Sequence, residues 1–288
     1  MTQLEPLIAR AEQLLERLEQ LLPQPDPAPN WTGHVAFRWR KPLQRGSLHP
    51  VRHPHRLRLK DLQCLERQKE ELVRNTRQFM AGLPANNALL WGARGTGKSS
   101  LIKALLNEFS AQGLRLIEVD KDDLIDLPEI VELIDGRPER FLIYCDDLSF
   151  EANDPSYKAL KAILDGSISA APDNVLIYAT SNRRHLLPEY MSENRDARIV
   201  DGELHHGEAV EEKISLSERF GLWLSFHPFG QDDYLLIVDY WLKELGHSTG
   251  LDEESRAAAL RWALTRGSRS GRVAWQFARD WVGRYGIG

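Results

Sequence analysis

Short runs of apolar residues alternate with stretches of helical periodicity along the middle of the chain. The apolar runs lie at residues 86–92, 115–120, 141–147, 174–182 and 222–228. Runs of this length without polar alternation are typical of strands buried on both faces of a sheet. Helical spacing occupies the segments at 98–113, 122–136 and 157–168. The alternation predicts an α/β fold with a five-stranded parallel sheet and helices on both faces.

Residues 230–288 carry no strand pattern. Their apolar residues recur at helical spacing, as Leu235, Val238, Trp241, Leu242, Leu245, Ala259, Trp262, Val273, Phe277 and Trp281. This spacing predicts three helices. We therefore expect a small helical lid domain over 230–288, after an α/β domain over 61–229.

Apolar residues repeat every three or four positions over residues 1–24, which predicts an N-terminal amphipathic helix. They are Leu4, Leu7, Ile8, Ala11, Leu14, Leu15, Leu18, Leu21 and Leu22. The helix ends where Pro23, Pro25, Pro27 and Pro29 alternate with polar residues, because proline lacks an amide donor and favours extended backbone. Two interpretations stay open: packing on the main domain, or self-association or docking to a partner helix.

The distribution of charge along the chain is uneven. The 288 residues include 37 lysines and arginines and 42 aspartates and glutamates, for a net charge of −5. Between Asp26 and Asp61 there is no acidic residue, yet eight basic ones occur: Arg38, Arg40, Lys41, Arg45, Arg52, Arg56, Arg58 and Lys60. The rest of the chain keeps 29 basic against 42 acidic residues.

Residues 25–60 are therefore predicted to be a proline-rich linker and basic arm. Nucleic acid is one candidate partner, through residues 38–60, and an acidic protein is another. Alternatively, the arm lies across acidic groups of its own protein or of a neighbouring subunit, and we favour this interpretation.

Several classes of protein are excluded by composition. No apolar stretch approaches the roughly 18 residues that cross a bilayer, and the N-terminus lacks a secretory signal pattern, so we expect a cytoplasmic protein. Two cysteines, Cys64 and Cys145, form neither a disulfide framework nor a zinc site. Adjacent His205 and His206 would point in opposite directions on an extended chain, which favours loop structure or partner contact over metal binding.

Residues 92–99, GARGTGKS, match the phosphate-binding pattern G-x-x-x-x-G-K-[ST] between a predicted strand and a predicted helix. Glycines let backbone amides point at a phosphate, Lys98 brings charge to the outer phosphates, and Ser99 offers a hydroxyl to Mg²⁺. The expected cofactors are ATP and Mg²⁺. The predicted nucleotide-binding residues of this loop are Gly92, Ala93, Arg94, Gly95, Thr96, Gly97, Lys98, Ser99 and Ser100.

Two acidic residues follow the apolar run at 141–145. Asp146 is the expected Mg²⁺ contact, together with Ser99, and Asp147 is the expected catalytic group that polarises the attacking water. Hydrolysing relatives of this architecture usually carry the longer Glu at the second position. The shorter Asp147 leaves three interpretations open: the groups of the site lie closer together, Glu151 assists, or hydrolysis is slow. Alternatively, Asp147 caps the helix that follows.

With these motifs the chain resembles an AAA+ P-loop ATPase. Over about residues 35–285 it is similar to a bacterial AAA+ family known only as a domain of unknown function, through the segments LLWGARGTGKSSL, CDDLSFE and SERFGLWLSF. The resemblance implies that Asn182 is the sensor-1 residue near the γ-phosphate. It implies that Arg219 is an arginine finger for the adjacent subunit, and that Arg272 is the sensor-2 arginine of the lid.

The arginine assignments have alternatives. Arg195 and Arg198 compete with Arg219 as the finger, and Arg219 could instead form a surface salt bridge with Glu218 or Glu212.

Arg272 could instead pair with Asp280 across the lid. Leu62 and Leu65 lie where AAA+ proteins usually contact adenine, and they are weak candidates for that contact.

The expected function is ATP hydrolysis that drives conformational remodelling of a protein or nucleoprotein partner. An arginine finger from a neighbour implies a homo-oligomeric ring, such as a hexamer. The alternative is a slowly hydrolysing, ATP-dependent switch or loader that contacts nucleic acid through the basic arm. A kinase of small substrates is a third class, which the helical lid and sensor arginines argue against.

Overall fold

The computed structural model describes the chain in two units, residues 1–30 and residues 31–288. The described residues are 28–41, 46–150, 154–165, 172–184, 186, 198–200, 203–205, 217–247 and 249–285, with Ile8, Arg10 and Gln13. These last three residues are helical. The rest of the amphipathic helix predicted over 1–24 lies outside the described residues.

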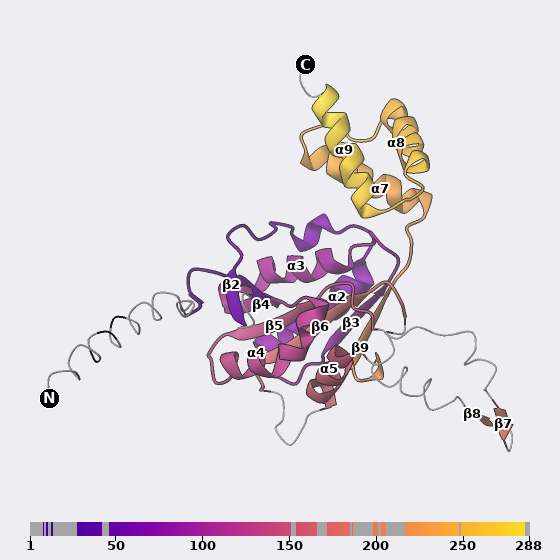
Figure 1. Cartoon of the computed structure of the whole chain (residues 1–288). Helices are drawn as coiled ribbons and strands as arrows, with labels where there is room; N and C mark the ends of the chain where they lie inside the picture. Colours follow the sequence, from indigo (N-terminus) through magenta and orange to yellow (C-terminus); the bar gives the residue numbers. More distant parts are fainter. Residues whose placement is uncertain are drawn as a thin grey trace. The chain divides into compact units, whose positions relative to one another are not determined.

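A seven-stranded sheet forms the centre of the second unit, with the strand order β2-β1-β4-β5-β6-β3-β9 (Figure 1). The strands are β1 (Ala36–Arg40), β2 (Ser47–Pro50), β3 (Ala88–Gly92), β4 (Leu114–Glu118), β5 (Arg140–Cys145), β6 (Val175–Ser181) and β9 (Leu222–Phe226). Every neighbouring pair is parallel except β1 and β2, which are antiparallel.

The expectation of a five-stranded sheet is wrong, although the five predicted strands are present as β3, β4, β5, β6 and β9. The two further strands, β1 and β2, come from the segment expected to be linker and arm. In β1 the residues Phe37 and Trp39 are buried, whereas the intervening Arg38 is half-buried and Arg40 is exposed. This alternation of buried and exposed residues is typical of a strand near the edge of a sheet with one polar face. The many arginines of the segment hid the strand pattern in the sequence.

A separate antiparallel pair consists of β7 (Arg198–Val200) and β8 (Glu203–His205). His205 is therefore the last residue of a strand, and His206 lies outside the described residues.

Helices cover both faces of the sheet, as predicted. Their bounds are α2 (Glu66–Met80), α3 (Lys98–Phe109), α4 (Leu127–Ile134), α5 (Pro155–Asp165), α7 (Gln231–Glu244), α8 (Glu253–Thr265) and α9 (Gly271–Tyr285). Short 3-10 helices are η2 (Leu59–Asp61), η3 (Ser110–Gln112) and η4 (Lys121–Asp126). The last three α-helices fall in the region where three helices were expected.

Two apolar cores lie on opposite faces of the sheet. On one face, Leu72 of α2 and Leu101 of α3 belong to a cluster that includes Leu142 of β5. On the other, Ile130 of α4 and Leu160 of α5 belong to a cluster that includes Ile143, the next residue of β5. Adjacent residues of one buried strand thus serve different cores, because successive side chains point to opposite faces.

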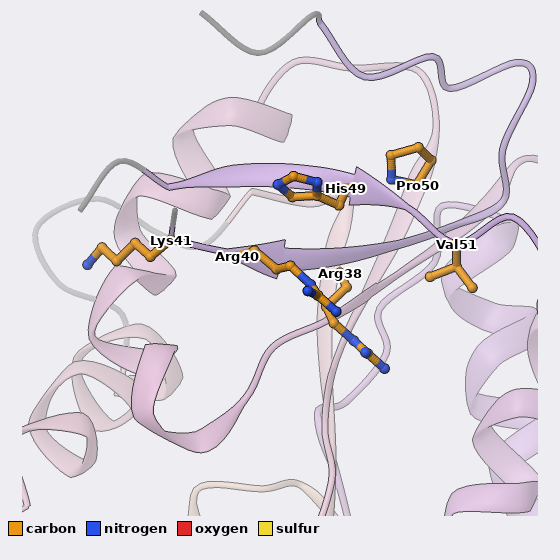
Figure 2. A pocket seen from close by; sticks show the side chains of 6 residues that line it. All are labelled: Arg38, Arg40, Lys41, His49, Pro50 and Val51. Carbon is orange, nitrogen blue, oxygen red and sulfur yellow. The ribbon is translucent and has the colours of Figure 1, made fainter. Parts of the chain in front are cut away.

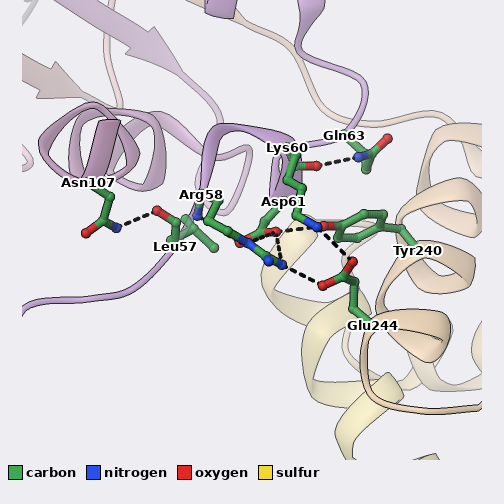
Figure 3. A network of polar contacts seen from close by, with 8 residues as sticks. All are labelled: Leu57, Arg58, Lys60, Asp61, Gln63, Asn107, Tyr240 and Glu244. Carbon is green, nitrogen blue, oxygen red and sulfur yellow. Dashed lines mark hydrogen bonds and ion pairs between the residues drawn. The ribbon is translucent and has the colours of Figure 1, made fainter. Parts of the chain in front are cut away.

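Four cations of the basic arm form ion pairs with acidic groups of the same chain. Arg38 contacts Glu118 at 2.5 Å, and Lys41 contacts Asp126 at 2.5 Å. Arg58 contacts Asp61 at 2.8 Å and Glu244 at 2.5 Å, and Lys60 contacts Glu244 at 3.3 Å (Figure 3). For these four residues the favoured interpretation is confirmed.

Three other arm residues, Arg40, Arg52 and Arg56, are exposed and form no ion pair with any described residue. Arg45 lies outside the described residues.

Among the described helices, none combines the length and apolar character needed to cross a membrane.

Candidate nucleotide-binding site

The loop 92–99 lies at the carboxyl end of β3, where the chain turns into α3 (Figure 1). Asp146 follows β5 directly, and Asn182 follows β6. Strands β5, β6 and β3 are adjacent and parallel, so their carboxyl ends meet at one edge of the sheet. Ligands of open α/β sheets bind at this edge.

Two glycines are required by the geometry of the loop. Gly92 has φ +134°, and a Cβ atom there would lie 2.0 Å from the backbone oxygen of Phe226 on β9. Gly97 has φ +101°, and a Cβ atom there would lie 2.8 Å from Cδ1 of Leu65. A side chain at either position would meet both backbone strain and a steric clash. The glycines therefore allow the loop to pass close to its neighbours.

The loop is held by a hydrogen bond to strand β9 and a hydrogen bond within the loop itself. Ala93 donates its amide to Phe226 at 3.2 Å, and the buried Thr96 hydroxyl donates to the Ala93 oxygen at 2.8 Å. Ser100 is half-buried in the first turn of α3. Because the first amides of a helix have no partner within it, this turn can receive an anion.

The ammonium group of Lys98 is buried and lies inside the loop. It donates to the backbone oxygens of Gly92 and Ala93 at 2.8 and 2.7 Å, and to Oδ1 of Asn182 at 3.2 Å. Burial lowers the pKa of Lys98 from its usual value, against the attraction of Asp146 and Asp147. A buried charge of this kind is stabilised by an anionic ligand.

Ser99 and Asp146 lie together beneath the loop. The Ser99 hydroxyl donates to Oδ1 of Asp146 at 2.7 Å, and the Thr180 hydroxyl donates to the same oxygen at 2.6 Å. Burial opposes ionisation of Asp146, but the hydrogen bonds from Thr180 and Ser99 outweigh it and lower the pKa of this carboxyl group. Asp146 is therefore held as a carboxylate.

Asp147 lies beside Asn182 and Arg94. Its Oδ1 atom accepts a hydrogen bond from Nδ2 of Asn182, and its Oδ2 atom lies 3.5 Å from Nη2 of Arg94. Its own backbone has φ +53°, an uncommon conformation for a residue with a side chain, and its amide donates to the Thr180 hydroxyl at 3.0 Å. The unusual backbone directs the carboxylate toward Asn182.

The alternative that Asp147 caps the following helix is wrong. That helix, α5, begins at Pro155, and the residue that accepts a side-chain hydrogen bond from its first turn is Asp154, from the amide of Ser156 at 3.0 Å. Glu151, the residue considered as an assisting group, lies outside the described residues.

The donor set fits a magnesium nucleotide. A serine hydroxyl and a carboxylate meet at one point, and both are hard oxygen ligands of the kind Mg²⁺ takes alongside nucleotide phosphates and water. Within the described part of the chain, no group of three or more His, Cys, Asp or Glu residues could hold a metal ion by itself. A metal here would therefore need phosphate oxygens as well as Ser99 and Asp146.

Leu62, Leu65 and the start of α9 border the loop. Leu65 and Leu62 are buried and are the nearest side chains to Gly97. On another side, the amide of Gly271 donates to the oxygen of Gly95 at 3.0 Å. Arg272, the next residue, is exposed in the first turn of α9, one residue from this contact.

The alternative partner of Arg272, Asp280, instead pairs with Arg284 at 3.0 Å.

A groove of about 780 Å³ also opens beside the loop. Its lining includes Arg94 of the loop, Phe229 before α7, and Arg261, Leu264 and Arg269 from α8 and the segment after it.

Arg219 does not lie at this site. It precedes β9, whereas the loop lies near the carboxyl end of that strand, since Gly92 pairs with Phe226. Arg219 forms an ion pair with Asp165 at the end of α5, whereas the alternative to the finger role was a salt bridge with Glu218 or Glu212. Arg195 lies outside the described residues, as does Glu212, and Arg198 lies in β7.

Neither cysteine side chain is among the polar groups of the site: Cys145 directly precedes Asp146 but is buried in the core with α4 and α5, and Cys64 is half-buried beside Leu65. Burial raises the pKa of the Cys64 thiol to about 11 and that of Cys145 to about 12. The thiols are therefore protonated near neutral pH, which makes them poor nucleophiles and poor metal ligands.

Sequence reasoning missed Thr180 and the contact between Gly95 and Gly271. Thr180 lies in the segment ATSN, two residues before Asn182, and alternation along a strand puts both on one face. That signal could have identified Thr180. The glycine contact joins residues far apart in the sequence and leaves no local pattern.

Comparison with known proteins supports this view of the fold. A family model described as protein of unknown function (DUF815) matches residues 32–285. A stretch of 68 residues is 38% identical to the replication factor C large subunit of Ignicoccus hospitalis, and covers 23% of this chain and 14% of that protein.

Solved structures resemble the chain over a larger share of its length. The RuvB Holliday junction branch migration motor of Thermotoga maritima matches with a TM-score of 0.51 and 15% identity, over 79% of this chain and 65% of RuvB. The Aeropyrum pernix ORC1 protein, solved in complex with DNA, matches with a TM-score of 0.50 and 15% identity, over 77% of this chain and 61% of ORC1. The chain thus spans less than two thirds of each of these proteins.

At identities this low, structural similarity shows only that the folds are alike. As far as the fold is concerned, the resemblance to AAA+ P-loop ATPases inferred from the sequence motifs is confirmed. The family match, by contrast, covers most of the chain. The chain therefore belongs to the DUF815 family of proteins of unknown function and has the α/β fold of the AAA+ P-loop ATPases.

Proposed function

We propose that this protein binds Mg-ATP at the loop 92–99 and hydrolyses it. The observation that carries the proposal is the continuous set of hydrogen bonds joining Lys98, Asn182 and Asp147 above the pair formed by Ser99 and Asp146. These are the groups needed to hold phosphates, a metal and an attacking water at one place.

In this proposal Lys98 exchanges its bonds to loop carbonyls for bonds to the outer phosphates. Its burial favours the exchange, because a charged ligand compensates the ammonium better than neutral oxygens do. Arg272 at the start of α9 contacts the same phosphates. When bound, Mg²⁺ held by Ser99 and Asp146 would neutralise charge that develops on the phosphates.

Asp147 and Asn182 orient the attacking water. Their mutual hydrogen bond fixes the carboxylate, and the water is proposed to bind on the side toward the γ-phosphate. Asp147 is one methylene shorter than Glu, and its Oδ2 atom lies 3.5 Å from Nη2 of Arg94, so its carboxylate reaches less far toward a water and is partly engaged by Arg94. We therefore expect slow hydrolysis.

Arg219 is proposed to act on the site of a neighbouring copy. It lies near the amino end of β9, so it is far from the loop of its own chain along the strand direction. An arginine that completes another copy's site requires a head-to-tail assembly, which closes into a ring such as a hexamer.

Residues 230–288 are proposed to act as the lid that transmits nucleotide state. The support is the contact between Gly271 and Gly95, through which a change in the loop would shift α9. The remodelled partner would be a protein or nucleoprotein. RuvB is a Holliday junction branch migration motor and ORC1 was solved in complex with DNA, which makes nucleoprotein the first class to test.

The first experiment measures nucleotide binding by calorimetry and turnover by phosphate release. We expect Lys98→Ala to abolish ATP binding, and Asp147→Asn to keep binding while lowering turnover by roughly 10²-fold or more. Glu108→Gln, an exposed acid on α3, is the matched control and should change neither. Absence of heat from Mg-ATP with the unaltered protein would refute the proposal.

The second candidate function is a slowly hydrolysing switch or loader that contacts nucleic acid. The observation that favours it is the short, arginine-paired Asp147. Steady-state turnover measured with and without DNA separates the two functions. Slow turnover that DNA leaves unchanged favours the switch, and strong stimulation favours the remodelling ATPase.

A further inference from the structure

We propose that one face of the β1–β2 hairpin binds the phosphodiester backbone of nucleic acid, with Arg40 as the principal contact. The inference rests on the second candidate function and deepens it, by naming the residues and the chemistry of the contact. It does not require that the protein hydrolyse ATP.

The register of the hairpin places its basic groups on one face. Arg38 pairs with His49, and Arg40 pairs with Ser47. Residues directly opposite one another share a face, and so do alternate residues of one strand. Arg38, Arg40 and His49 therefore project from the same side (Figure 2).

The opposite side anchors the hairpin in the protein. Trp39 and Leu48 are buried there in the core formed with α4 and α5. The Trp39 indole donates to Oδ2 of Asp126 at 3.0 Å, and a Cβ atom at Gly46 would lie 1.9 Å from the Trp39 ring. The hairpin is therefore a fixed platform for its basic face rather than a free arm.

A groove of about 670 Å³ opens over this platform. Its lining residues are Arg38, Arg40, Lys41, His49, Pro50 and Val51 (Figure 2). Every ionisable side chain of this lining is basic. Such a surface attracts anions, and the planar donor set of the arginine side chains favours phosphate in particular.

The three cations of the groove have different electrostatic surroundings. Arg38 donates to Glu118 through Nε and Nη2, at 2.9 and 2.5 Å, and Lys41 is paired with Asp126. These pairs orient the two side chains and offset their charge. Arg40 is exposed, and its side chain makes no hydrogen bond or ion pair with any described residue, so its charge is available to a ligand.

The shape and chemistry of the groove favour a polymer of phosphates over other anions. Pro50 and Val51 are the apolar residues of its lining, and two such residues make a poor binding site for a small organic ligand. An acidic peptide would gain its affinity by pairing with the open edge of β2, but that strand has four residues and ends at Pro50. A phosphate backbone can bind through the side-chain hydrogen-bond donors of this face alone, without pairing to the strand edge.

The test measures binding of the full-length chain to a labelled single strand and a labelled duplex of equal length, by fluorescence anisotropy over a series of salt concentrations. We expect affinity to fall as salt rises. Removing one phosphate contact with Arg40→Ala should lower the salt slope for duplex by about 0.9, equivalent to roughly eightfold weaker binding at about 0.1 M salt. The loss should be the same for different base sequences.

Arg52→Ala is the matched control, because Arg52 is also an exposed arm arginine but does not line the groove. It should keep the slope of the unaltered protein. DNA-free ATP turnover of Arg40→Ala should also be unchanged, so that a failure of hydrolysis and a failure of nucleic-acid binding are seen separately.

Three results would overturn the inference. The first is no binding of either oligonucleotide at any salt concentration. The second is an equal loss of affinity in Arg40→Ala and Arg52→Ala. The third is Arg40-dependent binding of a labelled polyglutamate peptide that is tighter than binding of DNA, which would assign the groove to an acidic protein.

Discussion

The hydroxyl of Tyr240 on α7 donates a hydrogen bond to Oδ1 of Asp61 at 2.6 Å (Figure 3). The same carboxylate accepts hydrogen bonds from Arg58, whose guanidinium group also reaches Glu244 of α7. Asp61 directly precedes Leu62, which borders the nucleotide loop. The network therefore connects the helical region after residue 230 to the margin of the candidate site.

Replacement of Asp61 by Asn should destabilise the protein at neutral pH by about 1–3 kcal/mol, because a buried carboxylate loses charge-assisted bonds. Burial opposes ionisation of Asp61, but the hydrogen bonds from Arg58 and Tyr240 outweigh it and lower its pKa. The stabilisation is therefore present above the pKa of an unfolded aspartate, near 3.9, and is lost as the pH falls through the lower folded value.

Urea denaturation at neutral and acidic pH measures this effect. The difference between the unaltered protein and Asp61→Asn should shrink in acid. Tyr240→Phe is the matched control, since it removes one hydrogen bond to Asp61 and leaves Arg58 in place, and it should cost less. A difference that stays constant down to acidic pH would contradict the assignment.

Thr180 should tune the metal site through its hydroxyl. Thr180→Val removes the bond to Asp146 and leaves the amide of Asp147 without its partner. Loss of such a supporting contact typically costs about 10–100-fold in metal affinity or activity. The Mg²⁺ dependence of ATP turnover measures it. Thr180→Ser keeps the hydroxyl and should behave like the unaltered protein, and a valine variant with the normal Mg²⁺ requirement would disprove the role.

Mixing two inactive variants tests whether Arg219 acts between copies. Arg219→Ala should keep ATP binding and lower turnover by roughly 10³-fold or more, and Lys98→Ala should lack binding. Random assembly of the two joins an intact loop to an intact Arg219 at about one interface in four, so turnover should reappear on mixing. Phosphate release from the mixture reports it.

Arg284→Ala, which removes another paired arginine, is the control and should retain turnover. If the mixture stayed as inactive as its components, action of Arg219 on a neighbouring site would be excluded.

Gly97→Ala should weaken both folding and ATP binding. The positive φ costs about 1–2 kcal/mol for a residue with a side chain, and the added methyl group would press on Leu65. Gly113 offers a matched control, because it has φ +102° but a Cβ atom there would meet no atom within 4 Å. Gly113→Ala should lose stability while keeping ATP binding. Thermal unfolding and calorimetry distinguish the two effects, and equal ATP affinity in both variants would refute the steric argument.

Local patterns were sufficient for the nucleotide loop and for the five strands β3, β4, β5, β6 and β9. The loop 92–99 is a contiguous motif whose glycines are required by its own backbone, and the strands are continuous apolar runs. The hairpin of β1 and β2 was missed, because Phe37 and Trp39 stand among arginines and their burial depends on Asp126 and the helices α4 and α5, far along the chain.

The sequence by itself determined the α/β class, the phosphate loop and the carboxylates that follow a buried strand, since each depends on neighbouring residues and on the period of a strand or helix. Only the tertiary structure decided that four arm cations pair within the chain, that Thr180 supports Asp146, and that Arg219 lies away from its own loop. Those facts depend on strand order and on contacts between distant segments, which no local period encodes.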